Sequence, residues 1–257
     1  MRNTKKSSNS KVKLSVALCI KNEGKRLKKC LDNLIFADEI VILLDGCSDN
    51  SKKIAKKYTN NIIEGNWPIE GDRRNLAIKY CKNNWILEVD ADEIVSESLA
   101  LEIKKTIQKN ESDWYPIVVD NYIGDKLIKY GWGCYIGKGK FAGLFRKGFK
   151  NWGLQRVHPK IILKGRGGKA LKTTLAHFVD SDIRDMFNRL NSYTDARALD
   201  IKENNDGGSF LGNIKRIFSR FFKCFILRKG YKEGRYGFFI AICAGLYPIC
   251  SYMKAKK

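Results

Sequence analysis

The chain alternates between two hydrophobic periodicities over its first 110 residues, and this alternation restricts the possible fold more than any other feature. Continuously apolar runs of strand length are separated by segments with apolar residues at helical spacing and lysine or arginine on the other face. The strand-like runs are 14–20, 39–44, 61–63 and 85–89. Strands that are apolar on both faces and joined by helices predict a parallel sheet covered on both sides. We therefore predict an α/β fold of the nucleotide-binding type.

The character of the sequence changes after residue 110, which divides the chain into segments. Glycine and aromatic residues are interspersed over 111–170 and predict short strands and hairpins, more antiparallel than parallel. A helix is expected over 182–203 and ends at the Asn/Gly-rich run 204–208. The predicted segments are a disordered basic lead-in without a secretory signal, two halves of one main domain, and a helical tail, over 1–12, 13–110, 111–205 and 206–257.

Acidic and amide side chains gather where the predicted parallel strands end. Asn22 and Glu23 follow the first run, Asp45 follows the second, and Asp90 and Asp92 follow the fourth. These positions meet at the carboxyl edge of a parallel sheet, where such sheets bind ligands. Carboxylate oxygens suit Mg²⁺ or Mn²⁺ and, through the metal, the phosphates of a nucleotide. A turn or a helix cap is the alternative for any single cluster, but converging carboxylates repel each other unless a cation or ligand is present.

Four sequence blocks carry a family resemblance. They read I-K-N-E-G, D-E-I-V-I-L-L-D-G-C-S-D-N-S, G-D-R-R-N-L-A-I and W-I-L-E-V-D-A-D-E, within residues 14–110. Their order and spacing resemble the N-terminal half of a family 2 glycosyltransferase, and more narrowly the bacterial enzymes that build lipopolysaccharide core and related surface glycans. The resemblance implies the GT-A fold, a mostly parallel sheet flanked by helices. It also implies sugar transfer from a nucleotide-sugar donor to a lipid-linked or surface glycan acceptor.

The resemblance implies roles for individual residues. Asp45 would hold the nucleobase, and a carboxylate that accepts from a base N–H is suited to uracil and hence to a UDP-sugar. Asp90 and Asp92 would bind the Mg²⁺ or Mn²⁺ that bridges the diphosphate, with Asp92 as the more direct ligand. Arg74 would lie near the phosphates or the sugar, and a surface arginine is its alternative.

Three further positions complete the implied donor site. Asn22 and Glu23 would line the nucleoside pocket. His177 stands where many GT-A enzymes supply a third metal ligand or a diphosphate contact. A histidine within an apolar run, as in Leu175-Ala176-His177-Phe178, can equally be a core residue.

The implied reaction is an inverting transfer, in which a base removes the proton of an acceptor hydroxyl and the oxygen attacks the anomeric carbon. The metal neutralises charge on the departing diphosphate. Related enzymes often read V-H-E where this chain has Val157-His158-Pro159, so proline replaces the candidate carboxylate. His158 is the predicted base or acceptor contact, since its unperturbed pKa suits proton transfer near neutrality. Asp180 and Asp182 are alternatives, although Asp182 also has the position of a helix cap.

The net charge of +22 requires a polyanionic neighbour. Residues 210–257 contain 11 Lys/Arg and a single acidic residue, Glu233. Aromatic and cationic residues interleave over 210–227, and a mostly apolar stretch, broken by Pro248, follows over 238–253. This pattern predicts attachment to an anionic membrane surface. Stacking on single-stranded nucleic acid is less favoured, and a helical hairpin packed on the core is a third possibility.

The cysteines place the protein in a reducing compartment. All eight are scattered without C-x-x-C spacing, and several lie inside apolar runs, which indicates reduced, buried thiols. Together with the tail, this predicts a cytoplasmic protein bound peripherally to the inner face of a bacterial plasma membrane.

Two other functions fit parts of the sequence. A nucleotidyltransferase also uses paired carboxylates and Mg²⁺, but it would normally need a glycine-rich phosphate loop, which Lys21-Asn22-Glu23-Gly24 does not supply. The non-enzymatic alternative is a membrane- or nucleic-acid-binding module with impaired catalysis, and the missing V-H-E carboxylate favours it.

Overall fold

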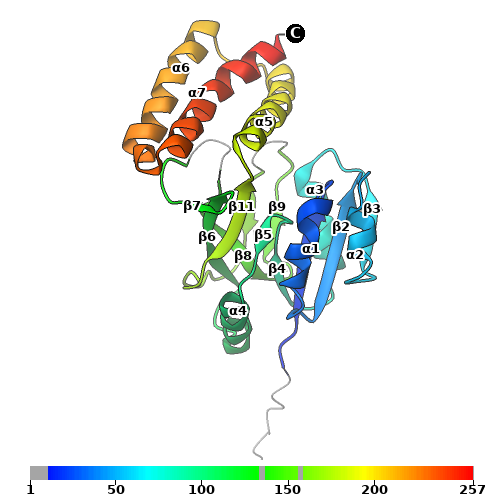
Figure 1. Ribbon diagram of the computed structural model, residues 1–257. Helices are drawn as coiled ribbons and strands as arrows, with labels where there is room; N and C mark the ends of the chain where they lie inside the picture. Colours follow the sequence, from blue (N-terminus) through cyan, green and yellow to red (C-terminus); the bar gives the residue numbers. More distant parts are fainter. Residues whose placement is uncertain (1–10, 133–136, 156–158, 257) are drawn as a thin grey trace, which may run out of the picture.

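Four parallel strands form the first half of the sheet, as the sequence predicts. The computed structural model describes residues 11–132, 137–155 and 159–256, and these strands lie in the order β3-β2-β1-β4 (Figure 1). The strands are β1 Leu14–Ile20, β2 Glu39–Asp45, β3 Ile62–Gly65 and β4 Trp85–Glu88. The connecting helices are α1 Gly24–Asp32, α2 Ser51–Ala55 and α3 Glu70–Tyr80. The carboxyl ends of all four strands therefore meet at one edge.

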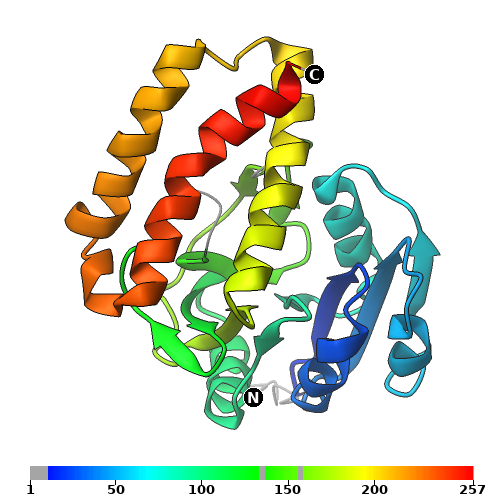
Figure 2. The ribbon, with the colours of Figure 1, turned by 45° about the horizontal axis from the view of Figure 1, so that its top comes forward.

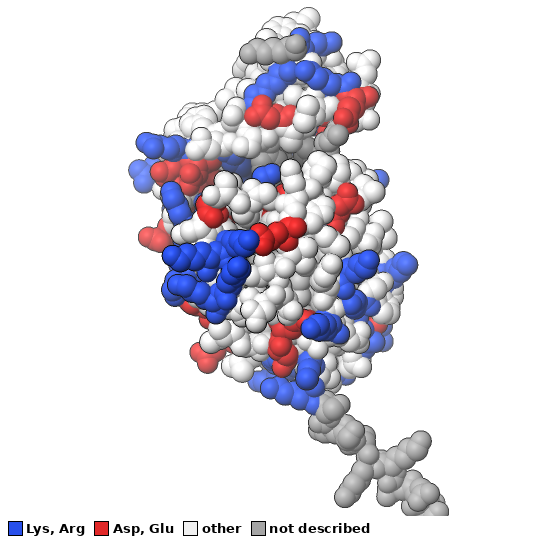
Figure 3. Space-filling view, turned by 90° about the vertical axis from the view of Figure 1, so that its right-hand side faces the viewer, with Lys and Arg blue, Asp and Glu red and all other residues white. Residues whose placement is uncertain are grey.

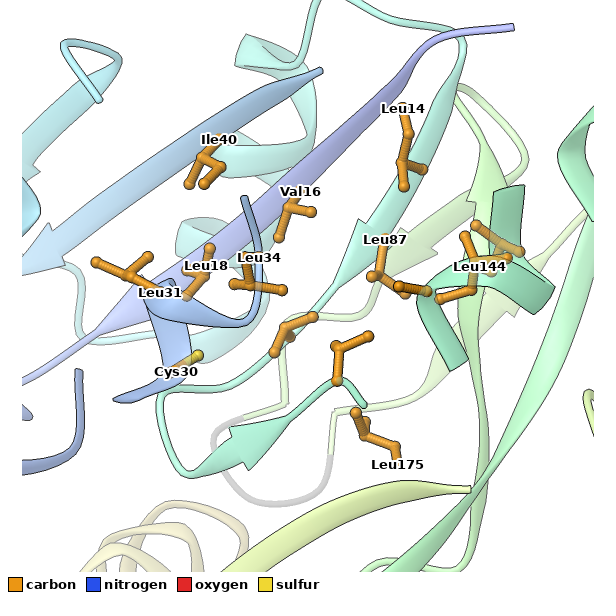
Figure 4. Close-up of a cluster of buried hydrophobic side chains, with 14 of the residues drawn as sticks. Leu14, Val16, Leu18, Cys30, Leu31, Leu34, Ile40, Leu87, Leu144 and Leu175 are labelled. Atoms are coloured by element: carbon orange, nitrogen blue, oxygen red, sulfur yellow. The ribbon is translucent and has the colours of Figure 1, made fainter. Parts of the chain in front are cut away.

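Both faces of this half-sheet are buried because alternate residues of each strand pack under different helices. Along β1, Val16 and Leu18 share a core with α1 and with α4, Glu97–Lys109, whereas Ala17 packs with α3 on the other face. Figure 4 shows side chains of the first core from β1, α1 and β4 pointing toward one another. The predicted sheet with helices on both sides is confirmed.

The sheet continues beyond residue 110 with mainly antiparallel strands. β8 pairs antiparallel with β4 and β6, β11 pairs parallel with β6, and β5 pairs antiparallel with β11. β7 pairs with β6, whereas β9 and β10 form a separate two-stranded sheet. These strands are β5 Glu93–Ile94, β6 Trp114–Ile123, β7 Lys126–Ile128, β8 Lys140–Arg146, β9 Lys150–Trp152, β10 Ile161–Leu163 and β11 Leu175–Asp180. Strands from both predicted halves therefore belong to one continuous sheet.

Three long helices lie side by side at one end of the molecule (Figures 1 and 2). They are α5 Ile183–Asn204, α6 Phe210–Phe222 and α7 Arg235–Ala255, with the π-helical turn η1 Lys223–Leu227 and the 3₁₀ turn η2 Gly230–Glu233 between α6 and α7. α5 begins and ends where the sequence predicts. The expectation that Pro248 breaks the last helix is wrong, because α7 continues through it. Proline removes a backbone donor, and packing of α7 against α5 and α6 offsets that loss.

The tail shares a hydrophobic core with the sheet. Ile123 of β6 and Ile128 at the end of β7 pack with Leu190 of α5 and with Ile240 and Cys243 of α7. α7 is long and apolar enough to cross a membrane by length and composition, with a mean hydropathy of 1.5, and half of that window is buried in the protein. A packed core helix has the same properties, and the contacts of α7 with α5, α6 and the sheet make it part of the domain.

Close contacts fasten the tail to the segment that follows β7. Glu233 Oε1 accepts hydrogen bonds from the backbone N–H groups of Lys129 at 2.8 Å and Tyr130 at 3.0 Å. Gly131 has a φ of +80°, and a Cβ added there would lie 2.9 Å from Cα of Gly230. Only glycine fits such a backbone approach without displacement.

The excess positive charge is not confined to the tail. Lysine and arginine side chains gather in several patches on the face that carries α2 and β3, with fewer acidic side chains between them (Figure 3). The basic surface therefore extends over the half of the domain that contains β1 to β4.

Candidate active site

A cavity of about 940 Å³ opens at the carboxyl edge of the parallel strands. Its walls come from the ends of β1, β2 and β4, the start of α3, residues 137–139 and the middle of α5. All three polar clusters predicted for this edge reach it, through Glu23, Asp45 and the run 90–93. Cationic side chains line the same walls, namely Lys21, Arg73, Arg74, Lys138 and Arg189. The cavity thus combines both signs of charge and is suited to a ligand with several anionic oxygens.

Asp45 lies at one end of the cavity with its carboxylate held in a fixed orientation. The residue is fully buried at the end of β2. Trp67 N donates to Oδ1 at 2.8 Å, and Arg73 Nη1 donates to Oδ2 at 2.5 Å. Lys21 Nζ lies 3.7 Å from Oδ2. Cations on one oxygen and a backbone donor on the other offset the cost of burying this carboxylate at the cavity wall.

Asp90 follows β4 at the other end of the cavity and contacts two cations. Arg74 Nη2 lies 3.1 Å from Oδ1, and Lys138 Nζ donates to Oδ2. Arg74 is itself anchored by Glu70, 2.7 Å from its Nε, and Lys138 also donates to Glu93 at 2.7 Å. Burial alone would raise the pKa of Asp90, but Arg74 and Lys138 outweigh it and hold that pKa well below its usual range. Burial raises the pKa of Glu93, with the Asp90 charge adding to the effect.

Asp92 faces the predicted histidine. His177 Nε2 lies 3.3 Å from Asp92 Oδ2, and Arg26 Nη1 lies 3.8 Å from the same oxygen. His177 Nδ1 lies 2.9 Å from Asn121 Oδ1, an oxygen that also accepts from Lys138 N. Because that oxygen is an acceptor, Nδ1 is the protonated nitrogen. Nε2 is therefore the ring nitrogen that faces Asp92.

The donor set at this end fits a divalent cation only in part. A carboxylate oxygen of Asp92 and an imidazole nitrogen of His177 converge, and both are ordinary ligands of Mn²⁺. Both oxygens of Asp90 are instead occupied by Arg74 and Lys138. Within the described residues no group of three or more His, Cys, Asp or Glu side chains is arranged to hold a metal. The structure thus brings Asp92 and His177 together as predicted, while Asp90 is an acceptor for protein cations.

The two residues that follow β1 have different positions. Glu23 lines the cavity, where burial and the nearby Asp92 raise its pKa. Asn22 is exposed and does not line the cavity; its Oδ1 accepts from Ser48 N at 2.8 Å and its φ is +56°. The predicted pocket role of Asn22 stays a prediction, and in the structure its side chain fixes the loop after β1 against the loop after β2.

The identity of the catalytic base remains a prediction. His158 lies outside the described residues, although the adjacent Pro159 lines the cavity. Asp182 is exposed and caps α5, with its Oδ1 accepting from Asp185 N at 3.0 Å, and it does not line the cavity. The predicted catalytic role of Asp182 stays a prediction. The buried Asp180 pairs with Arg189 Nε at 2.9 Å.

Sequence reasoning missed a buried ion pair at the cavity wall. Lys150 Nζ donates to Glu88 Oε2 and, at 2.8 Å, to the carbonyl of Ala142, while Trp152 Nε1 donates to Glu88 Oε1 at 2.8 Å. Burial lowers the pKa of Lys150, and Glu88 opposes part of that shift. Asn121 and Lys138 were also missed, because the glycine-rich segment that contains Lys138 has no local motif. Arg73 could have been found as the neighbour of Arg74 in the G-D-R-R-N block.

The fold and the cavity define an α/β domain with a charged cavity at the carboxyl edge of its parallel strands, and the sequence comparisons identify the family. The sequence model of "Glycosyl transferase family 2" matches residues 15–158, more than half of the chain, and the protein belongs to that family of glycosyltransferases. The predicted family and the predicted GT-A fold class are confirmed.

Similar proteins span nearly the whole chain. The lipopolysaccharide core biosynthesis glycosyltransferase LpsC of Rhizobium meliloti is 25% identical over 260 residues, covering 95% of this chain and 92% of that protein. An uncharacterized glycosyltransferase of Rickettsia prowazekii is 24% identical over 261 residues, covering 95% and 86%. The structure of S. aureus TarS 1–349 in complex with UDP matches with a TM-score of 0.50 at 13% identity, over 90% of this chain and 89% of that chain. This likeness supports the same fold.

Proposed function

We propose that the cavity binds a UDP-sugar and that the enzyme transfers the sugar, with inversion, to a lipid-linked or cell-surface glycan. The observation that carries the proposal is the presence of Asp45 and the Asp92–His177 pair in one cavity at the carboxyl edge of the sheet. The names of two similar proteins support it, since TarS was solved with UDP and LpsC acts in lipopolysaccharide core biosynthesis.

The residues of the cavity have separate tasks in this proposal. Asp45 accepts from the N–H of the base, and its fixed carboxylate favours uracil. Arg73 and Arg74 face the phosphates, and Arg74 is held rigid by Glu70 and by stacking over the Trp152 ring at 4.8 Å. A preorganised arginine neutralises the leaving diphosphate without reorganising during the reaction.

Asp92 and His177 would hold a divalent cation together with diphosphate oxygens. Mg²⁺ and Mn²⁺ commonly bind through one or two protein ligands plus substrate phosphates, so the absence of Asp90 from the ligand set is compatible with such a site. When bound, the ion supplies positive charge to the departing diphosphate. His158 is the proposed base, which takes the proton of the acceptor hydroxyl as its oxygen attacks the anomeric carbon.

Release of the nucleotide product tests this proposal. UDP formation is measured over a panel of UDP-sugars, with Mn²⁺ or with EDTA, for the wild type and for Asp92→Asn. We expect UDP release by the wild type in Mn²⁺ and a loss of at least about tenfold in Asp92→Asn. Asp125→Asn, an exposed carboxylate in the β6–β7 turn, is the matched control and should behave as wild type.

Other outcomes identify the alternatives. Release of pyrophosphate from a nucleoside triphosphate would indicate a nucleotidyltransferase. If no UDP-sugar binds or turns over, the module is non-catalytic and the proposal fails. The anomeric configuration of the product, read by NMR, decides between inversion and retention.

We also propose that the exposed face of α6 and η1 lies on the cytoplasmic side of a bacterial plasma membrane. Large apolar side chains on this face are solvent-exposed, with Leu211 at 72%, Phe218 at 70% and Leu227 at 65%. Lys215 and Arg220 belong to the same helix. An apolar face bordered by cations is complementary to anionic lipid, which supports an in-plane helix rather than a nucleic-acid site.

Flotation with anionic liposomes tests the membrane proposal. The double variant Phe218→Ser/Phe222→Ser removes two exposed aromatic side chains, and we expect it to reduce flotation several-fold. Leu101→Ser, which changes a side chain 55% exposed on α4, is the control and should leave flotation unchanged. Equal flotation of the double variant and the wild type would refute the proposal. Point variants are preferable to truncation after residue 205, because truncation would remove α7 from the shared core.

A further inference from the structure

Lys138 extends from the loop before β8 into the acidic end of the cavity. Its ammonium donates to Asp90 and, at 2.7 Å, to Glu93. The side chain is 32% exposed, compared with 15% for Arg74, the other cation on Asp90. Lys138 is thus the more accessible of the two cations that neutralise this carboxylate.

The position of Lys138 is fixed by the buried Asn121. Lys138 N donates to Asn121 Oδ1 at 2.9 Å, and Asn121 Nδ2 donates to the Lys138 carbonyl at 2.7 Å. The same Asn121 oxygen accepts from His177 Nδ1. A single amide therefore positions both the lysine backbone and the imidazole that faces Asp92. Such a two-sided arrangement on a buried residue distinguishes Lys138 from a surface lysine.

The carboxylates at this end of the cavity create a need for a cation that can move toward an anionic ligand. Glu23, Asp90, Asp92 and Glu93 all line this end, and they would repel a diphosphate. The ammonium of lysine is a compact charge on a flexible four-carbon stem, so it can turn from Asp90 toward a ligand while its backbone stays in place. Arg74, by contrast, is constrained by Glu70 and Trp152.

We propose that Lys138 is a diphosphate-binding residue whose ammonium neutralises Asp90 and Glu93 in the free enzyme and contacts the β-phosphate when donor binds. This inference rests on the proposed UDP-sugar donor. In the reaction the acceptor oxygen bonds to the anomeric carbon, the bond from that carbon to the β-phosphate oxygen breaks, and its electron pair stays on the diphosphate. The acceptor proton goes to the base. Lys138 remains protonated and stabilises the departing charge.

Binding of UDP and of uridine, measured by titration calorimetry in EDTA and again in Mn²⁺, tests the proposal. Lys138→Met should weaken UDP binding in EDTA about tenfold, the scale of one charge-assisted hydrogen bond, and leave uridine binding unchanged. Lys138→Arg should restore most of the UDP affinity. Lys140→Met changes an exposed lysine two positions further along and serves as the control. Lys138→Gln, which can still donate to Asp90 and Glu93, provides an uncharged variant if the methionine variant does not fold.

The outcomes separate this proposal from the one on which it rests. If the wild type binds UDP and the folded Lys138 variants bind it within twofold of the wild type, the role of Lys138 is refuted and the donor proposal stands. Tighter UDP or Mn²⁺ binding by the variants would also refute the proposed role of Lys138. Its ammonium would then be a group that competes with Mn²⁺ for the carboxylates. If the wild type binds neither UDP nor a UDP-sugar, both proposals fail.

Discussion

Replacing Lys150 with methionine should cost a large share of the folding free energy. The Lys150 side chain is 0% exposed and its partner Glu88 is 5% exposed, so the variant leaves a buried carboxylate without its counter-charge. Breaking a buried pair in this way costs about 3–5 kcal/mol. Methionine fills most of the lysine volume, which keeps any cavity contribution small. A protein of this size should then melt roughly 6–20 °C lower, at about 2–4 °C per kcal/mol.

Urea titration followed by tryptophan fluorescence and far-UV circular dichroism measures this loss. Glu88→Gln keeps an acceptor for Trp152, so the double variant Lys150→Met/Glu88→Gln removes both charges, and both variants lose the same hydrogen bond to the Ala142 carbonyl. We expect the double variant to be more stable than Lys150→Met by at least about 1 kcal/mol. Lys140→Met, an exposed control, should change stability by less than about 0.5 kcal/mol. The reasoning would be refuted if Lys150→Met lowered the free energy of unfolding by less than about 1 kcal/mol. It would also be refuted if the losses of the two single variants were additive in the double variant.

Three further predictions concern local packing. Gly71→Ala would place a Cβ 1.9 Å from the carbonyl oxygen of Gly153, so we expect a loss of about 1–3 kcal/mol in thermal denaturation, and an unchanged midpoint would contradict the contact. Ser96→Ala removes the cap of α4, a hydrogen bond of 3.2 Å from Leu99 N, and should cost about 1 kcal/mol in urea titration. Burial raises the pKa of the Cys81 thiol to about 12, so mass spectrometry after iodoacetamide treatment near about pH 8.5 should find it unmodified in the native protein but modified in urea.

The parallel half of the fold could be predicted because its signals are local. Each strand from β1 to β4 is a contiguous apolar run, and the helices between them show their own periodicity. β5 could not be predicted, because Glu93–Ile94 is a strand only through its pairing with β11. The continuity of α7 through Pro248 likewise depends on helices packed beside it. Pairing and packing between distant segments leave no local pattern in the sequence.

The residues of the site likewise fall into those with a local sequence motif and those positioned by contacts between distant segments. Asp45 and Asp92 lie at strand ends with recognisable motifs, and family resemblance located His177. The state of Asp90 could not be deduced from D-x-D alone, because Lys138 approaches from a segment far along the chain. Asn121, which positions Lys138 and His177 together, is an ordinary polar residue of a strand until β6 and β11 pair. Sequence therefore identified the carboxylates and Arg74, but not Lys138, the second cation on Asp90.

The core shared by α7 and the sheet fixes how far the cavity stands from any surface on which α6 rests. Gly131 and Gly230 are in direct backbone contact, and Ile240 belongs to the same hydrophobic core as Ile123, so the tail is packed directly on the sheet. An acceptor anchored in a bilayer would then present to the cavity only those hydroxyl groups that lie at one height above the lipid. Under the membrane proposal, the enzyme would select its acceptor by the length of the glycan, measured from the lipid end, as well as by the identity of the terminal sugar.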